Sequence, residues 1–199
     1  GLAYVRLLKP ISYYHRKYGT AFFGLNKLYL LMEKQHNRGQ DGAGNATLKL
    51  NTEPGSHFMH RLRVSGAGAI KEIFQKVNEE VVEIEKSYPD IRQYPGLLKG
   101  YLRFMGEAMM GHLRYGTQGK NNVEFCHPFV KADINPSRTL TMAGNFNLVN
   151  TEELFTKFNQ DKSILNSNKD SDLAAMIETI YHYICEDETE HPGTINLES

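Results

Sequence analysis

Three residues that suit chemistry better than packing fall within one stretch, residues 111–150. Arg114 ends the apolar part of GHLRYGTQG, where a buried strand would favour valine or leucine, and Thr117 lies in the glycine-punctuated turn that follows. Asn145 follows RTLTMAG, a second predicted strand. A guanidinium can bind a carboxylate through two parallel hydrogen bonds, and a positioned amide can donate to a developing oxyanion. We therefore predict a site for a small zwitterionic ligand at these strand ends.

The segments before this stretch predict a strand, a loop and a helix. Residues 2–8 form a short apolar run that is typical of a buried strand. The polar and aromatic segment KPISYYHRKYG, opened by Pro10, predicts a loop. Apolar residues then recur at helical spacing over residues 20–35, and Gly39 can adopt the left-handed conformation that closes a helix.

A β-hairpin and further helices are predicted next. NATLKLN places Ala46 and Leu48 on one face of a strand, and HFMHRLRV places Leu62 on the inward face of its partner, with the turn NTEPGS between them. Apolar residues then recur at helical spacing over residues 70–84. Two prolines interrupt that pattern before a short predicted helix at residues 96–105.

The last part of the chain predicts two more helices. TEELFTKF is capped by Asn150 or Thr151, with Glu153 as the partner of a capping box. A polar loop leads to a final helix with a stripe of four apolar residues, Leu173, Ile177, Ile180 and Ile184. Strands with helices before and after them, and an early hairpin, indicate an α+β fold.

The composition limits the class of protein. The 199 residues suit one domain, 1–199, with a sizeable core. Lys plus Arg equals Asp plus Glu, 23 each, so no global field favours nucleic acid or an anionic membrane. No apolar run approaches the roughly 18 residues of a membrane span. Two cysteines, Cys126 and Cys185, form neither a disulfide framework nor a metal set, and together these features favour the cytoplasm.

Cys126 and His127 are neighbours, which raises the question of a thiol nucleophile and its base. Adjacent residues of an extended segment point to opposite faces, so these two side chains are poorly placed to pair. We interpret Cys126 as a buried and inert thiol, and we assign His127 no role.

Four blocks occur in an order that resembles one enzyme family. QHNRGQDGAG, GHLRYGT, the Pro-Phe pair of FCHPF and GNFNLVNTEEL are similar to the core of the class II glutamine amidotransferases. Within that family they resemble the amidophosphoribosyltransferases, because Gly39 is followed by Gln40 and then by Ala43. The resemblance implies the four-layer αββα sandwich of the N-terminal nucleophile hydrolases, incomplete here at its C-terminal end. It also marks residues 75–106 as a helical insertion of unknown purpose.

The resemblance implies a site for glutamine. The arginine that matches Arg114 binds the α-carboxylate of glutamine, and the aspartate that matches Asp170 binds its α-ammonium group. Four more residues belong to the predicted substrate site: Arg38, Tyr115, Thr117 and Gln118. From the residues alone other interpretations stay open, with Arg114 as a salt-bridged strand end, Asp170 as a helix N-cap and the others as turn or helix-end residues.

The resemblance implies catalytic residues as well. The asparagine that matches Asn145 lends its amide to an oxyanion hole, although an asparagine after a glycine also suits a plain turn. The family has glycine next, where this chain has Phe146, so the second donor, a backbone N–H, would lie in a differently shaped hole. Gly1 matches the glycine directly after the nucleophilic cysteine, which is not in this sequence. We expect that cysteine to precede Gly1 in the native protein, and a degenerate relative is the alternative.

The leading hypothesis is a domain that hydrolyses the side-chain amide of L-glutamine to glutamate and ammonia. Its partner is a synthase or phosphoribosyltransferase domain that accepts the ammonia, in purine biosynthesis, and the chain is expected to be part of a longer protein that forms a homo-oligomer. We expect no cofactor and no metal in this domain, and neither nucleic acid nor membrane as a partner. The alternatives are a non-catalytic glutamine-binding or regulatory module on the same fold, and a structural interaction domain whose partner uses residues 75–106.

Overall fold

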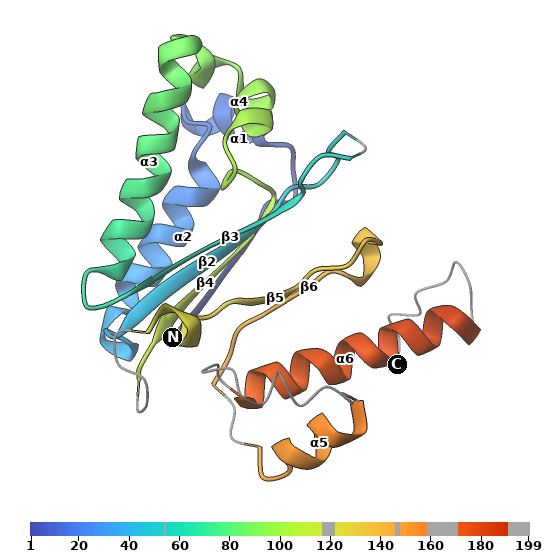
Figure 1. Ribbon diagram of the computed structural model, residues 1–199. Coiled ribbons are helices and arrows are strands. Elements are labelled where there is room, and N and C mark those ends of the chain that lie inside the picture. The colour runs from blue at the N-terminus through green and yellow to red at the C-terminus, as the bar shows by residue number, and fades with distance from the viewer. Residues whose placement is uncertain (54, 117–121, 146–147, 159–170, 191–199) are drawn as a thin grey trace. The chain divides into compact units, whose positions relative to one another are not determined.

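The computed structural model describes residues 1–53, 55–116, 122–145, 148–158 and 171–190 of the chain. These residues belong to two compact units, Gly1–Pro128 and Phe129–Ser199 (Figure 1). Within the described ranges, the first unit contains a four-stranded sheet with its helices, and the second contains a two-stranded sheet with its own helices.

The first unit is built on an antiparallel sheet with the strand order β1-β4-β2-β3. Its strands are β1 (Leu2–Arg6), β2 (Gly42–Leu48), β3 (Met59–Ser65) and β4 (Ala108–Arg114). β2 and β3 form the predicted hairpin, with Asn45 opposite Leu62. β4 lies between β1 and β2 and pairs with both, so it joins two strands that begin some forty positions apart in the sequence.

Both faces of the central strand β2 are covered, which its sequence pattern does not reveal. The first six residues of β2 are all buried. A side chain at Gly111, the partner of Asn45 on β4, would collide with Met32 of α2, so Asn45 faces the helices. Because successive side chains alternate between faces, Ala46 points to the other side. Leu62 is opposite Asn45 and faces the helices, so Ala46 lies on the other face of the sheet. Because β2 is buried on both sides, neither of its faces needs to be polar.

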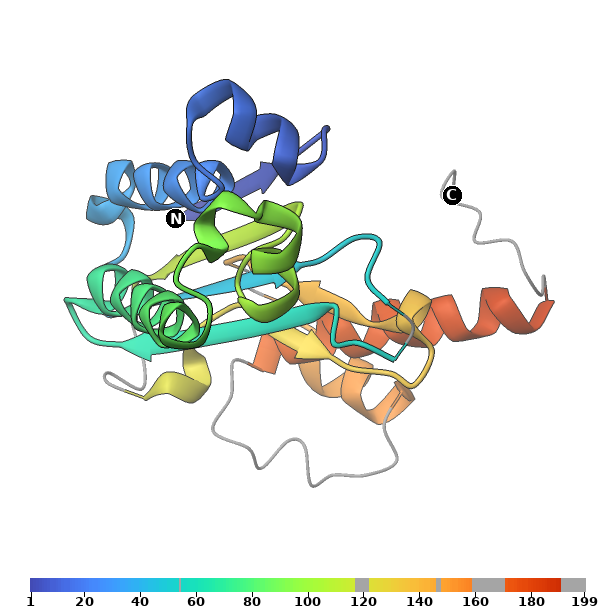
Figure 2. The same cartoon turned by 90° about the horizontal axis from the view of Figure 1, so that it is seen from above.

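The helices of the first unit cover one face of this sheet. They are α1 (Ile11–Tyr18), α2 (Phe23–Lys34), α3 (Ala69–Ser87) and α4 (Pro95–Tyr101). The first unit also contains short 3₁₀ helices at His36–Arg38, Ile91–Gln93 and Val123–Phe125. Figures 1 and 2 show α2 and α3 side by side, with α2 against β1 and β4 and α3 against β2 and β3. Leu28, Met32 and Ile73 are fully buried where these helices meet the sheet. Residues 75–106 are thus largely helical, and their being an insertion stays a prediction.

The loop predicted for KPISYYHRKYG is wrong, because this segment contains α1. Pro10 takes the position just before the helix, where its fixed φ and missing N–H do no harm. Gly19 closes the helix in the left-handed conformation, with φ 72°. Ile11 is buried and Tyr14 stacks on Phe23 of α2 at 4.9 Å between ring centroids. Tertiary packing of aromatic rings therefore stabilises a helix that the polar sequence conceals.

The prediction for Gly39 is also wrong. α2 ends at Lys34, a 3₁₀ turn follows at His36–Arg38, and Gly39 has φ 177°, which is extended backbone. The requirement for glycine at this position therefore comes from its surroundings, which belong to the candidate site described below.

The second unit pairs a small sheet with two helices. Its elements are β5 (Phe129–Lys131), β6 (Leu140–Met142), α5 (Thr151–Phe158), α6 (Ser171–Glu190) and the 3₁₀ helix Pro136–Arg138. β5 and β6 pair antiparallel, and their apolar residues pack with Leu173 and Ile177 of the predicted stripe on α6. Lys131 donates to both carboxylate oxygens of Glu178 at 2.8 Å, which ties β5 to α6.

Two hydrogen bonds to Asp172 of α6 hold the segment near the start of α5, and the helix cap expected at Asn150 or Thr151 stays a prediction. Thr151 donates its hydroxyl to Asp172 of α6 at 2.7 Å, and the backbone N–H of Leu148 donates to the same carboxylate at 3.1 Å. Asp172 therefore fixes the segment that leads into α5. Sequence patterns do not reveal this contact, because its partners are more than twenty residues apart.

Each unit consists of an antiparallel sheet with helices packed on it, which confirms the predicted α+β class and is the local architecture that an αββα sandwich requires. The assignment of 1–199 to one domain stays a prediction. No helix in the described ranges is long and apolar enough to cross a membrane.

Candidate functional site

Three strand ends meet at one end of the four-stranded sheet. β4 ends at Arg114, β2 begins at Gly42 directly opposite, and β1 begins one residue after Gly1. Gly1 and Leu113 exchange both backbone hydrogen bonds, at 2.9 and 2.8 Å. In this antiparallel register, a residue placed before Gly1 would form a non-hydrogen-bonded pair with Arg114. The side chains of such a pair share one face, and their α-carbons lie about 4.5 Å apart.

The guanidinium of Arg114 is buried in this corner. Arg114 is 7% exposed, and its guanidinium carbon lies 5.4 Å from the centroid of the Phe125 ring. A side chain at Gly116 would come within 2.8 Å of Nη1 of Arg114, so this glycine leaves room for the guanidinium. Electrostatic interactions are stronger in such a shielded place than in water. Arg114 is therefore well placed to bind a carboxylate.

Gly39 packs directly on the backbone of Arg114. A Cβ at Gly39 would lie 2.7 Å from both the carbonyl carbon and the carbonyl oxygen of Arg114, closer than carbon atoms in proteins approach backbone. The turn after α2 can therefore cross the end of β4 only where it lacks a side chain. This close approach, and not a left-handed conformation, explains why position 39 of the QHNRGQDGAG block is a glycine.

Asp41 connects the strand ends through three hydrogen bonds. Its backbone N–H donates to the carbonyl of Arg114 at 3.0 Å, and its own carbonyl accepts from Gly66 at 3.0 Å. Its carboxylate accepts the backbone N–H of Gly116 at 2.8 Å. Sequence reasoning missed Asp41, although an acidic residue set among glycines just before a buried strand was a usable signal.

Arg38 and Gln35 lie beside Gly1. A Cβ at Gly1 would lie 2.9 Å from Oε1 of Gln35 and 3.3 Å from Cβ of Arg38. Gln35 donates from Nε2 to the carbonyl of Leu2 at 2.8 Å. Arg38 thus lies next to Gly1, and its role in the site stays a prediction. Gln35 is a neighbour that the sequence did not single out.

Cys126 and His127 lie next to this corner without forming a catalytic pair. Cys126 is fully buried, and burial raises the pKa of its thiol, although Arg114 and Arg63 lower it in part. A thiol of this kind stays protonated near neutral pH, which agrees with an inert cysteine. The ring of His127 lies 4.5 Å from that of His112, between centroids, and both histidines are buried.

The other predicted site residues divide into two groups. Tyr115 follows Arg114 and is 75% exposed, and Asn145 lies exposed in the second unit, beyond the end of β6. Four predicted residues lie outside the described ranges, namely Thr117, Gln118, Phe146 and Asp170. The first unit thus places Gly1 near Arg38 and Arg114, and the roles of all the predicted site residues stay predictions.

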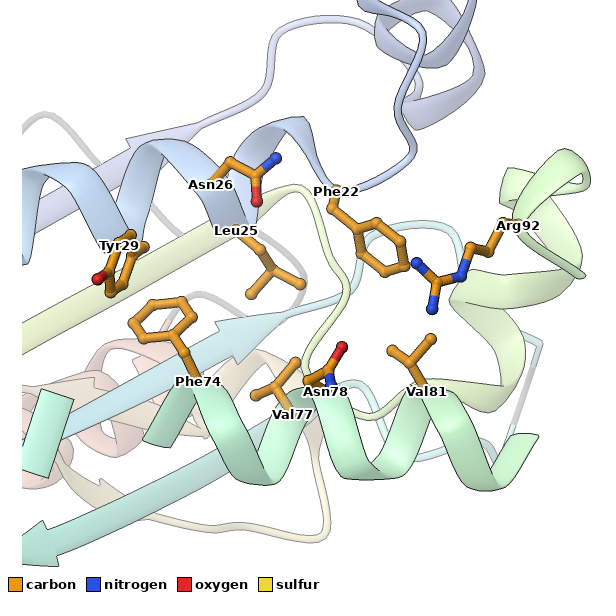
Figure 3. A pocket seen from close by; sticks show the side chains of 9 residues that line it. All are labelled: Phe22, Leu25, Asn26, Tyr29, Phe74, Val77, Asn78, Val81 and Arg92. Atoms are coloured by element: carbon orange, nitrogen blue, oxygen red, sulfur yellow. The ribbon is translucent and has the colours of Figure 1, made fainter. Parts of the chain in front are cut away.

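A separate groove of about 370 Å³ lies between α2 and α3 (Figure 3). Its walls are aromatic and aliphatic side chains, and its polar residues are two asparagines and Arg92. Arg92 is already paired with Glu85 at 2.8 Å and lies over the ring of Phe22. The groove adjoins the start of α2, whereas Gly1 contacts Gln35 at the other end of that helix. It is therefore not part of the strand-end site.

Comparison with known proteins places this chain in a family. No protein-family model matches the chain. The amidophosphoribosyltransferase of Pasteurella multocida is 32% identical over 140 residues, 70% of this chain and 21% of that protein. The amidophosphoribosyltransferase of Bacillus subtilis is 28% identical over 168 residues, 84% of this chain and 27% of that protein.

The chain is a relative of the amidophosphoribosyltransferases. This confirms its resemblance to the class II glutamine amidotransferase domains. The chain spans only about a fifth to a quarter of the length of these curated relatives. Among solved structures, the glutamine phosphoribosylpyrophosphate amidotransferase of B. subtilis, complexed with ADP and GMP, has a TM-score of 0.49 and 22% identity, covering 90% of this chain and 28% of that one.

Proposed function

We propose that this chain is the glutamine-hydrolysing domain of a glutamine amidotransferase. It converts the side-chain amide of L-glutamine to glutamate and ammonia and delivers the ammonia to a synthase or phosphoribosyltransferase domain. Purine biosynthesis is the proposed setting, since the relatives are amidophosphoribosyltransferases. We also propose a cytoplasmic location and a homo-oligomeric assembly.

The register of β1 and β4 is the observation that carries this proposal. A residue before Gly1 would lie beside Arg114 and share its face of the sheet. A nucleophile at that position would therefore stand next to a buried guanidinium that can bind the α-carboxylate of an amino acid. No other end of this sheet, within the described residues, combines a buried arginine with a strand start.

The proposed reaction uses a cysteine directly before Gly1. Its thiolate would attack the side-chain amide carbon of glutamine, and its own α-amine would carry the proton to the leaving ammonia, because an α-amine has a pKa near working pH. Water would then hydrolyse the glutamyl thioester and release glutamate. Asn145 and the backbone N–H of Phe146 are the proposed oxyanion donors, and Asp170 is the proposed partner of the α-ammonium group.

Arg114 has the role of binding the substrate in this scheme. It would hold the α-carboxylate equally in the ground state and in the transition state, since that group does not react. Such uniform binding affects KM and not kcat. Tyr115, Thr117, Gln118 and Arg38 are proposed to line the same pocket.

The test is an assay of the chain with a cysteine placed directly before Gly1, next to a matched chain with serine there. We expect ammonia release from glutamine with cysteine and at least a hundredfold less with serine, because serine is a weak nucleophile at its ordinary pKa. Thermal stabilisation by glutamine without ammonia release would favour the non-catalytic binding module. Absence of both would contradict the proposal.

A further inference from the structure

The start of β1 lies on the edge of the sheet, so half of its backbone groups face away from β4. Among the residues that the structure describes, β1 pairs with β4 alone, as the first strand of the order β1-β4-β2-β3. Gly1 and Leu113 exchange backbone hydrogen bonds, so the N–H and carbonyl of Gly1 point towards β4. The N–H and carbonyl of Leu2 therefore point away from β4, towards the edge of the sheet. The position before Gly1 has the same outward orientation as Leu2. An edge strand frays at its end unless another group holds it.

Gln35 holds this edge. It follows the last residue of α2, and its Nε2 donates to the carbonyl of Leu2 at 2.8 Å. The rest of its side chain fills the space beside Gly1, because a Cβ on Gly1 would lie 2.9 Å from Oε1 and 3.2 Å from Cβ of Gln35. The same side chain thus bonds to one residue of the strand start and packs on the other.

The base of Gln35 is itself fixed. Its backbone N–H donates to the carbonyl of Met32 at 3.0 Å, and Met32 is fully buried between α2 and the sheet. Leu28 and Met32 anchor α2 against β4 where Gly111 leaves space for them. The packing of α2 on the sheet therefore fixes the backbone of Gln35, and the side chain of Gln35 in turn holds the start of β1.

We infer that Gln35 is a positioning residue that sets the approach of the nucleophile to glutamine. The inference rests on the proposed function, in which the nucleophile directly precedes Gly1. If the strand start drifts outward, the nucleophile leaves its attack position while the groups that hold the two charged ends of glutamine stay in place. A misplacement of this kind lowers the rate of the chemical step far more than the affinity for substrate.

The experiment compares three variants of the full-length enzyme. Gln35→Ala removes the donor and the packing, and Gln35→Glu keeps the shape but replaces the donor with an acceptor that the Leu2 carbonyl repels. Gln75→Ala is the matched control, because it removes a glutamine whose Nε2 donates a hydrogen bond of similar length, to Glu79 at 2.9 Å, on the exposed side of α3. Circular dichroism and thermal unfolding establish that each variant is folded.

We expect kcat for glutamine hydrolysis to fall roughly tenfold or more in both Gln35 variants, with KM changed by about twofold at most. The rate at which an electrophilic glutamine analogue alkylates the nucleophile should fall by the same factor as kcat, which a loss of stability alone would not produce. Gln75→Ala should behave as the native enzyme in both assays. A folded Gln35→Glu enzyme with native kcat and native alkylation rate would overturn the inference, and so would a rise in KM equal to the fall in kcat.

A second comparison separates this inference from the proposed function. If replacement of the cysteine before Gly1 leaves ammonia release unchanged, the proposed function itself is wrong. If that replacement abolishes ammonia release while Gln35→Glu keeps native kcat, only the role of Gln35 is wrong. Should Gln35→Ala fail to fold, the isosteric Gln35→Glu variant decides by the same criteria.

Discussion

The two ends of the four-stranded sheet carry similar charged residues in different surroundings. At the end where β2 finishes, Glu107 accepts the backbone N–H of Leu50 at 2.8 Å and pairs with Lys99 at 2.7 Å. Lys49 donates from the same cluster to the carbonyl of Lys99 at 2.7 Å. The side chains of Lys99 and Glu107 are only 15% and 12% exposed. These paired side chains tie α4 to the sheet and are themselves largely buried.

At the end where β4 finishes, Asp41 likewise accepts a backbone N–H at 2.8 Å, from Gly116. Here, however, the neighbouring cation is Arg114, which lies over an aromatic ring, and Gly116 stands where a side chain would crowd its guanidinium. The first cluster ties a helix to the sheet, whereas we propose that the guanidinium of Arg114 binds the α-carboxylate of glutamine. The comparison predicts that substitutions near Glu107 lower the stability of the fold, whereas substitutions near Arg114 also weaken the binding of glutamine.

The largest effect is expected from Arg114→Ala. Loss of a charge-assisted fork to the α-carboxylate should weaken glutamine binding by about 2–3 kcal/mol. Titration calorimetry with glutamine, alongside the free energy of unfolding, measures both consequences. The binding loss should exceed the stability loss, and unchanged glutamine affinity would show that the pocket is elsewhere.

Gly39→Ala should come next. Its Cβ would lie 2.7 Å from the Arg114 backbone, so the end of β4 must shift, at a cost of about 1–3 kcal/mol in stability and with weaker glutamine binding. Gly100→Ala is the matched control, because Gly100 lies in α4 with no atom within 4 Å of an added Cβ. That control should be neutral or stabilising, since alanine favours helix. Equal effects of the two substitutions would remove the argument for close approach at Gly39.

Asp41→Ala and Glu107→Ala compare the two ends directly. Each removes a carboxylate that accepts a backbone N–H at 2.8 Å, and each should lower the free energy of unfolding by about 1–2 kcal/mol. Only Asp41→Ala should also raise KM for glutamine, because Gly116 lies against the guanidinium of Arg114. Steady-state kinetics and chemical denaturation provide the two measurements. A similar KM in both variants would contradict the functional distinction between the ends.

The smallest effect concerns Lys49 and pH. Burial lowers the pKa of Lys49 below the value of 10.5 that it has when unfolded. Between its folded pKa and 10.5 the unfolded state binds more protons than the folded state, so this lysine makes stability rise with pH in that window. The difference in unfolding free energy between the native protein and Lys49→Met should therefore shift in favour of the native protein as pH is raised towards about 10. Glutamine affinity at neutral pH should be unchanged, and a shift of the opposite sign would contradict the burial argument.

The sequence by itself determined the elements with strong periodicity and the identity of the central residue. α2 and α3 follow from regular apolar spacing, which local geometry imposes on any helix with a buried face. The strand ending at Arg114 follows from an apolar run that breaks into a glycine-punctuated turn. The order of the four motif blocks determined the family, and comparison with relatives confirmed it. Arg114 was recognisable because a charged residue at the end of a buried strand needs a reason.

Only the tertiary structure decided how these residues meet. α1 depends on aromatic rings of another helix, so its own sequence lacks the pattern that would reveal it. β2 was predicted as a strand, but its burial on both faces was not. Asp41 and Gln35 act through hydrogen bonds to backbone groups that lie 75 and 33 positions away. Backbone groups carry no sequence signature, because every residue has them. The pairing of Gly1 with Leu113 follows from strand register, which is set by the packing of the whole sheet and not by either segment alone.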